Sequence, residues 1–491
     1  MNDTTARIWP VPSATTVFVF IVLLASLLLA PLVVRNPLVA VAAVLATALA
    51  TAAFVHPPLA VYVIVLMPLM AGIDRGTALP LIRPAEAITI LVGVAVFVRI
   101  LLALASGDPV LTVPSSAEAS ILFLAVAGSV FPLLFLVARG EMPTQDDILY
   151  SVQVPKFVLV YVIVRASIRT KEQVGRCLRL AMAVGAVVAV LGIFQAVDVL
   201  GIRQLLVTYF PPTDDALVGS SRASSTLAHP FAMADLMIFN VAIAGAWFAR
   251  MGHHHWLLTA GALFAVGALS SGEFSGALGL VVAVVVLGLL TGHLRRAVVG
   301  LVPVAIIAGV VLRPVIDARL QGFTSPEGVP DSWLGRIYNL QTFVWPRLTD
   351  GLNWVLGVRP SARVPIGNAP EPFVYIESGY IWLLWVGGVP LLVGFITFLV
   401  SNLRATMRRA HQNDQIGAAS TAAFVALSVV AVLTVLDPHL TLRGSGDLLF
   451  VLLALAHGVH RRREKTTAPA SIVGRNSLPR SRALPYPVPG G

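Results

Sequence analysis

Three charged side chains stand beside long apolar segments and have the chemistry for group transfer. Glu377 comes just before the segment "GYIWLLWVGGVPLL", Arg222 lies in the hydroxyl-rich stretch "GSSRASSTLAHP", and Arg336 lies in "GRIYNLQTFVWP". A guanidinium holds a phosphate group through two parallel N–H donors. A carboxylate at a helix start is kept ionised by the helix dipole and can accept a proton from a hydroxyl. These residue types therefore suit transfer of a group from a phosphate to a hydroxyl.

Each of these residues also has a simpler structural interpretation. Arg222 suits a solvated loop, and Glu377 suits the first turn of any helix. Arg336 and Trp345 suit an amphipathic segment that lies on lipid headgroups. Glu273, in the turn "SSGEFSGALGL", either orients an arginine or is an ordinary polar turn residue. The residue patterns alone leave both interpretations open.

Other polar residues bear on the interior of the protein and on metal binding. Lys156 and Asp235 are charges inside apolar segments, where a charge usually faces a cavity or another charge, so a pair between them is one possibility. The histidines at 253–255 lack ligand spacing. The single cysteine, Cys177, excludes an internal disulfide and a multi-cysteine metal site. We therefore expect no metal and no cofactor.

The composition indicates that membrane-spanning helices position these residues. The chain of 491 residues is 57% hydrophobic and 12% charged, with a mean hydropathy of +0.86, whereas soluble domains carry about 25% charged residues. Apolar runs recur along it, each near the length that crosses ~30 Å of hydrocarbon. The sequence predicts an all-α polytopic membrane protein with about 12–14 transmembrane helices. The candidate spans are 16–34, 38–55, 58–72, 85–105, 118–138, 147–165, 178–197, 230–249, 255–270, 276–291, 297–312, 377–400, 416–436 and 446–460.

The basic residues predict the orientation of these helices. They cluster in every second loop between the later spans and after the last span, so the positive-inside rule places both termini in the cytoplasm. Two long loops, about 198–229 and 313–376, then lie in the periplasm, and we expect short helices in the larger one. The same topological role accounts for the net charge of +10, so no nucleic acid is expected as a partner. Residues 1–463 form the transmembrane domain, and 464–491 form a Pro-, Ser- and Arg-rich cytoplasmic tail expected to be disordered.

Four motifs in one order carry a resemblance to a known family. They are "SSRASSTLAHPFAMADL", "SSGEFSGALGL", "GRIYNLQTFVWP…DGLNWVLGV" and "ESGYIWLLWVGGVPLL", within about residues 220–400. Their order resembles the O-antigen ligase and O-antigen polymerase superfamily of bacterial membrane glycosyltransferases. The resemblance implies a metal-independent enzyme of the inner membrane that takes a glycan from undecaprenyl diphosphate. The glycan passes at the periplasmic face to an acceptor glycan or lipid.

The resemblance also implies roles for particular residues. Glu377, Arg222 and Arg336 are the expected catalytic residues. Substrate-binding roles are expected for Arg359, His229, Tyr380, Trp345 and Arg347. Ligases of the family typically have a histidine where this chain has Glu377, and the family's Ser-Arg-Gly turn reads Phe274-Ser275-Gly276 here. An acidic residue at the first position is more similar to the polymerase and exopolysaccharide branches.

Two other classes of protein stay open at this point. A flippase or other transporter of lipid-linked glycans would show two related halves with cavity charges in both. In this chain the largest loop, 313–376, follows the eleventh predicted span, so the two halves differ. A non-catalytic scaffold for envelope assembly would not need Arg222, Arg336 and Glu377 to converge. Convergence of these three side chains is the observation that separates an enzyme from both.

Overall fold

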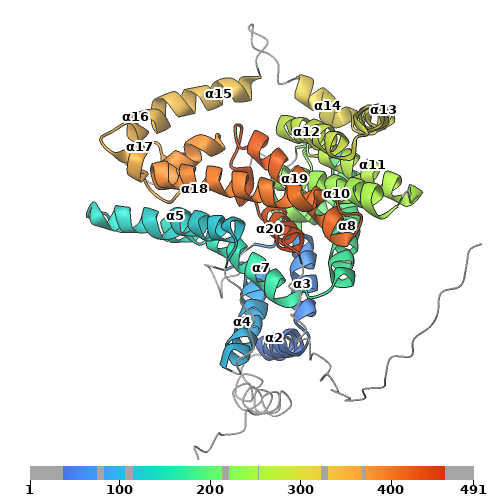
Figure 1. Ribbon diagram of the computed structural model, residues 1–491. Coiled ribbons are helices and arrows are strands. Elements are labelled where there is room, and N and C mark those ends of the chain that lie inside the picture. Colours follow the sequence, from blue (N-terminus) through green and yellow to red (C-terminus); the bar gives the residue numbers. More distant parts are fainter. Residues whose placement is uncertain are drawn as a thin grey trace, which may run out of the picture. The chain divides into compact units, whose positions relative to one another are not determined.

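The described part of the protein consists almost entirely of helices (Figure 1). The computed structural model describes residues 37–74, 82–105, 114–212, 220–252, 254–321, 330–367 and 372–458. Within these ranges, nine helices are long and apolar enough to cross a membrane. The chain is thus an all-α polytopic membrane protein, as predicted. The predicted span 16–34 and the predicted tail 464–491 lie outside the described residues.

Each predicted span from 38–55 onward coincides with a helix, within a few residues. The longer helices are α4 (Pro84–Ala105), α5 (Ser116–Ala138), α6 (Gln145–Ser151) with α7 (Gln153–Ser167), α8 (Lys171–Val197), α10 (Pro230–Met251), α12 (Phe274–Thr291), α13 (Leu294–Val311), α18 (Gly379–Ala410) and α19 (Gln415–Leu433). Shorter apolar helices are α2 (Pro37–Val55), α3 (Pro57–Leu66) with η1 (Met67–Leu69), α11 (His255–Ser270) and α20 (Ser445–Ala456). Helices dominate because a backbone in lipid must satisfy its polar groups internally.

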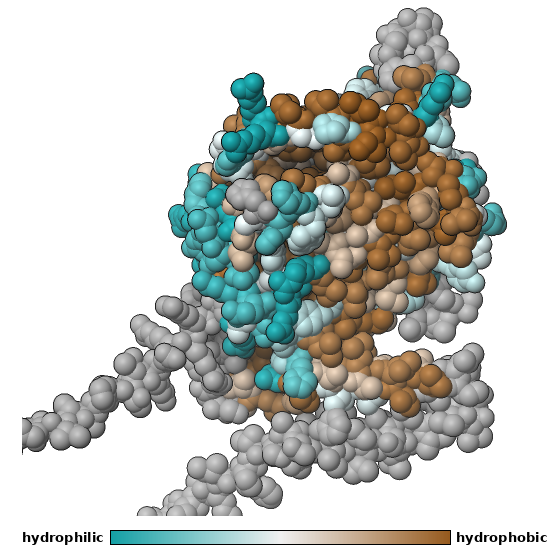
Figure 2. Space-filling model, turned by 90° about the vertical axis from the view of Figure 1, so that its right-hand side faces the viewer, coloured by the Kyte–Doolittle hydropathy of each residue, from teal (hydrophilic) through white to brown (hydrophobic). Residues whose placement is uncertain are grey.

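The helices differ sharply in how far they are buried. In α10, 78% of the most apolar window is buried inside the protein, against 11% in α13. Helix α10 therefore lies at the centre of the bundle, where it packs on α11 and α19, and α13 lies at its margin. On the side of the molecule shown in Figure 2, a broad hydrophobic surface lies beside a hydrophilic band. This surface suits contact with lipid tails.

The two ends of the bundle differ in character. At one end lie the basic residues that start α8 or finish α10 and α18, where Lys171 pairs with Asp414 at 2.8 Å and the Arg409 guanidinium donates to the Ala456 carbonyl. The opposite end gathers the loop before α10, the turn between α11 and α12, the segment after α13 and the segment between α19 and α20. The predicted long loops and the predicted catalytic residues belong to this second end.

The predicted large loop contains more structure than expected. It contains α14 (Arg313–Leu320), α15 (Asp331–Asn339), η4 (Leu340–Val344), α16 (Trp345–Leu348) and α17 (Asn353–Leu356). It also contains an antiparallel pair of strands, β1 (Arg363–Pro365) and β2 (Phe373–Tyr375), that the sequence analysis did not predict. Helices α15, α16 and α17 form an arch beside α18 (Figure 1). This arch brings Arg336 over the start of α18.

A glycine lets the arch approach α18 closely. Gly388 has φ 61° and ψ −154°, and it divides α18 at a kink. This backbone region is open to glycine alone. A Cβ there would lie 2.0 Å from the carbonyl oxygen of Val355 in α17, so the missing side chain is what allows α17 to pack on the kink.

Candidate functional site

Arg336 connects two carboxylates that come from different parts of the chain. It stands in the last turn of α15, and its Nε lies 3.3 Å from a carboxylate oxygen of Glu377, just before α18. Its Nη1 lies 3.3 Å from Asp437, in the segment that joins α19 to α20. The Glu377 side chain is 37% exposed and that of Asp437 only 10% exposed. Arg336 therefore ties the large loop to the ends of two membrane-spanning helices.

A second set of ion pairs surrounds Glu273, the residue that precedes α12. Its side chain is 5% exposed and contacts the guanidinium of Arg222, from the loop before α10. Its other oxygen lies 3.1 Å from Nη2 of Arg319 in α14. Arg319 Nε also donates to the Gly272 carbonyl. Of the two interpretations that the sequence left open for Glu273, the structure thus favours orientation of arginines.

The two sets of ion pairs form one electrostatic unit. Burial raises the pKa of Glu377, and the carboxylates of Asp437 and Glu273 add to this rise while Arg336 and Arg222 oppose it. Burial also raises the pKa of Asp437 and of Glu273. Glu273 and Arg222 of the second set thus act on Glu377, and Asp437 of the first set acts on Glu273. We call this unit the arginine–carboxylate cluster; its members are Arg222, Glu273, Arg319, Arg336, Glu377 and Asp437.

A buried histidine–aspartate pair lies next to the cluster. His439 Nδ1 is 2.8 Å from a carboxylate oxygen of Asp235 in α10, and both side chains are almost completely buried. Burial alone disfavours a charged imidazole, but the Asp235 carboxylate, with help from Asp437 and Glu273, leaves the pKa of His439 above its usual value. The pair anchors the short segment that carries Asp437 to the centre of the bundle.

Two of the three predicted catalytic residues contact each other, and the third belongs to the neighbouring set of ion pairs. Glu377 contacts Arg336 directly, whereas Arg222 joins them through its contact with Glu273 and through its charge. His229 lies at the N-terminus of α10, and its ring is 5.3 Å from that of Phe231, which in turn contacts the His439 ring. His229 is therefore close to the cluster by way of these rings.

Two of the predicted substrate-binding arginines make structural contacts elsewhere. Arg359 holds Asp147, at the start of α6, with two hydrogen bonds of 2.6 and 3.1 Å. Arg347 donates to the Pro365 carbonyl at 3.0 Å. Both contacts fasten the large loop, and the Asp147 carboxylate that Arg359 neutralises is fully buried. These contacts account for both arginines without a substrate.

The structure gives Tyr380 a partner in a neighbouring helix and places Trp345 at the surface. The Tyr380 hydroxyl donates to the Ala431 carbonyl at 3.0 Å and so joins α18 to α19. Trp345 is 53% exposed on the arch. An exposed aromatic ring there suits contact with lipid headgroups or with a sugar equally well.

Sequence reasoning missed several members of the site. Asp437 and His439 lie in "DPHL" between two apolar runs, and only their position at a span end could have drawn attention to them. Arg319 resembled any other arginine of the large loop. The possible pair between Lys156 and Asp235 is absent: Lys156 lies 3.6 Å from Asp447, whereas Asp235 pairs with His439.

The chemistry available in the cluster is that of cations and carboxylates. Among the residues that the structure describes, no group of three or more His, Cys, Asp or Glu side chains is placed to hold a metal ion. Three guanidinium groups can stabilise charge on an oxyanion, and the partly exposed carboxylate of Glu377 can accept a proton. A comparison of the sequence with protein-family models finds no match, and neither does a comparison with curated proteins.

Proposed function

We propose that the protein is a membrane glycosyltransferase that moves a glycan from undecaprenyl diphosphate onto an acceptor glycan or lipid. The observation that carries this proposal is the contact of Arg336 with Glu377 inside the arginine–carboxylate cluster. A cation for a leaving diphosphate and a carboxylate for an attacking hydroxyl thereby stand side by side. The motif order described above supports the polymerase or ligase class.

The arginines suit a diphosphate leaving group. Arg222, Arg319 and Arg336 keep 28%, 25% and 21% of their side-chain surface exposed, so a ligand can reach them. As the glycosidic C–O bond breaks, negative charge grows on the diphosphate, and preoriented guanidinium groups stabilise that charge. The cluster carboxylates neutralise the arginines before the donor arrives, and the diphosphate takes over part of this role when it binds.

The partly exposed carboxylate of Glu377 suits the role of general base. Its contact with Arg336 uses one carboxylate oxygen. The second accepts the proton of the acceptor hydroxyl while the hydroxyl oxygen bonds to the anomeric carbon and the diphosphate leaves with the bonding electrons. Asp437 is much less exposed and shares Arg336, so we assign it the role of positioning that arginine.

The position of the cluster suits a lipid-linked substrate at the periplasmic face of the inner membrane. The cluster lies at the end of the bundle opposite the basic residues, and basic loops mark the cytoplasmic side. A polyprenyl chain can remain in the bilayer beside the hydrophobic surface of Figure 2 while its diphosphate reaches the arginines.

Reconstitution tests this function directly. Purified protein in liposomes with a polyprenyl-diphosphate-linked oligosaccharide should release polyprenyl diphosphate and form a longer or transferred glycan. The main alternative, a flippase, would move the same lipid across the bilayer with its glycosidic bond intact. Flux without bond cleavage would therefore contradict the proposal and favour transport.

A further inference from the structure

The loop that carries Arg222, residues 220–229, is buried to an extent that is uncommon between two helices. Its residues from Ala223 to Ala228 have exposed fractions of only 0–3%. Ser225 and Ala228 have φ of 49° and 60°, a left-handed region that costs free energy for residues other than glycine. Such a backbone persists only where the surrounding contacts impose it. The contacts that impose it therefore also determine where the backbone of Arg222 lies.

The side chain of Gln195, near the end of α8, holds two consecutive amide groups of this loop. Its Oε1 accepts hydrogen bonds of 3.0 Å from the N–H of Ser224 and 2.7 Å from the N–H of Ser225. Its Nε2 lies 3.5 Å from the Ser224 hydroxyl oxygen. Gln195 is 5% exposed, and buried backbone N–H groups need acceptors. Loss of the Gln195 oxygen would therefore leave two buried donors unpaired.

The loop is also bonded to two other parts of the bundle. The Ala223 N–H donates to the Ser270 carbonyl at the end of α11 at 3.1 Å. The Thr226 hydroxyl donates to the Pro68 carbonyl in η1 at 2.7 Å, and the Gly72 N–H donates to the Thr226 carbonyl at 2.8 Å. None of these bonds uses a side chain from outside the loop. Gln195 is thus the contact that a substitution can remove without changing the loop itself.

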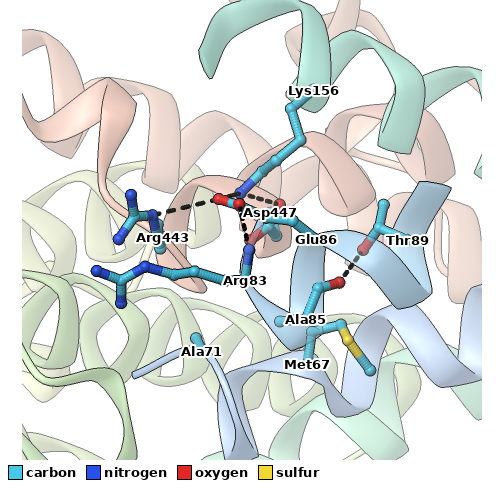
Figure 3. A pocket seen from close by; sticks show the side chains of 9 residues that line it. All are labelled: Met67, Ala71, Arg83, Ala85, Glu86, Thr89, Lys156, Arg443 and Asp447. Carbon is cyan, nitrogen blue, oxygen red and sulfur yellow. Dashed lines mark hydrogen bonds and ion pairs between the residues drawn. The ribbon is translucent and has the colours of Figure 1, made fainter. Parts of the chain in front are cut away.

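The segment after η1, on which the loop rests, has its own supports. Asp74 lies 3.6 Å from Arg83, just before α4. Ala71 lines a small pocket whose other charged side chains pair with one another (Figure 3). These pairs are Lys156 with Glu86 and with Asp447, and Arg443 with Glu86. Support for the loop on this side therefore comes from the protein itself.

The first amide that Gln195 holds comes two residues after Arg222. The Arg222 guanidinium contacts Glu273, and in the proposed reaction it stabilises the charge of the leaving diphosphate. Such donors are effective because they are already oriented when the charge develops. We propose that Gln195 is a positioning residue for Arg222, so that the transfer rate depends on a buried side chain in α8. This inference rests on the proposed function.

Three substitutions of Gln195 separate its hydrogen bonds from its bulk. Gln195→Met keeps the size but removes the acceptor, and it should lower the transfer rate per folded protein in liposomes by roughly 10–100-fold, as displacement of a catalytic group does. Gln195→Glu keeps an oxygen in the same place, and the Ser224 hydroxyl can turn to donate to the other oxygen, so this variant should keep most of the rate. Gln195→Asn withdraws the oxygen by one methylene and should fall between them; it replaces the methionine variant if that one does not fold. Wild-type rates in both the methionine and asparagine variants would overturn the proposal.

A buried amide elsewhere in the bundle provides the matched control. Asn402 in α18 is 0% exposed, and its Nδ2 donates to the Ser120 hydroxyl at 3.1 Å. Asn402→Leu also removes a buried hydrogen bond, so it should lower the midpoint of thermal unfolding. The transfer rate per folded protein should stay close to that of the wild type. An equal loss of rate in this control would overturn a specific role of Gln195.

A double variant shows whether Gln195 acts through Arg222. If it does, adding Gln195→Met to Arg222→Ala should slow transfer little further, whereas two independent effects would multiply. The unfolding midpoints in detergent give the same comparison without the reaction. The double variant should lose less than the sum of the two single losses, because both substitutions release the same loop. Independent effects on both readouts would overturn the role of Gln195.

The two readouts also distinguish this inference from the proposed function. A wild-type protein that transfers no glycan would overturn the proposed function, and the midpoints would then decide alone whether Gln195 is coupled to Arg222. Normal transfer by the wild type together with independent effects of the two substitutions would overturn only the role of Gln195.

Discussion

Arg336 Nε lies 3.3 Å from the carboxylate of Glu377, although one residue belongs to the arch of the large loop and the other begins a membrane-spanning helix. The sequence predicted the membrane-spanning helix but not where the large loop lies relative to it. The contact between Arg336 and Glu377 joins the two. Because Arg336 also contacts Asp437, a movement of the arch would take the guanidinium away from both carboxylates at once. The geometry of the arch and the reactivity of Glu377 are therefore coupled.

The arginines should be required for transfer, and their shape should matter as well as their charge. Arg222→Ala and Arg336→Ala should each lower the transfer rate in liposomes by about 10²–10³, the usual cost of removing one preoriented donor. Arg→Lys should restore little, because an ammonium does not reproduce the two-pronged donor. Arg203→Ala, at a similar exposure, is the matched control and should keep nearly full activity. Full activity of both lysine variants would indicate a purely electrostatic role.

Protonation of Glu377 should determine how the transfer rate falls at acid pH. A general base acts only when deprotonated, and burial together with Asp437 and Glu273 raises the pKa of Glu377. The transfer rate should therefore fall as the pH drops through this raised pKa, at a higher pH than for an ordinary glutamate of pKa about 4.3. Glu377→Asp should keep a falling acid limb at lower rate, and Glu377→Gln should leave a residual rate without it. Measurement of kcat/KM against pH checks this; an identical acid limb in the glutamine variant would assign it to another group.

The membrane orientation is tested by labelling. Leu352, on the arch, is 65% exposed, and His293 lies in the turn at the opposite end of the bundle. The native Cys177 is buried, so it should stay silent. In intact cells an impermeant thiol reagent should label Leu352→Cys, while His293→Cys should react only after permeabilisation. The reverse pattern would place the cluster in the cytoplasm and remove the proposed access of a periplasmic acceptor.

Gly388 should be intolerant of a side chain. In Gly388→Ala the new Cβ would meet the Val355 carbonyl, and the backbone would keep a conformation that costs about 1–3 kcal/mol for other residues. We expect a clearly lower unfolding midpoint in detergent and a displaced arch. Gly261→Ala in α11 is the control, because no atom lies within 4 Å of its added Cβ; that variant should be as stable as the wild type or slightly more so. Equal midpoints for the two variants would contradict the close packing of α17 on the kink.

The features that the sequence predicted correctly are those that a single short stretch of residues determines. The spans followed from run lengths, and the position of Glu377 just before a membrane-spanning helix followed from a charge beside a long apolar segment. The partners of these residues did not follow from any local pattern, because Asp437 and Arg319 reach the cluster only through the packing of α14, α15 and α19. For the same reason Arg359 was expected at the site, whereas the structure pairs it with a buried aspartate at the start of α6. The strand pair β1–β2 was missed because each strand is three residues long and shows no usable alternation.

The most direct test of the central claim, that Glu377 takes the acceptor's proton beside Arg336, is a paired measurement on Glu377→Gln in liposomes. Donor binding and glycan transfer are measured on the same preparation with polyprenyl-diphosphate-linked oligosaccharide. Glutamine keeps the shape of glutamate but accepts no proton at working pH, so we predict near-normal donor binding and a transfer rate lower by at least ~10²-fold, as for loss of a general base. Near-normal transfer by this variant would contradict the account.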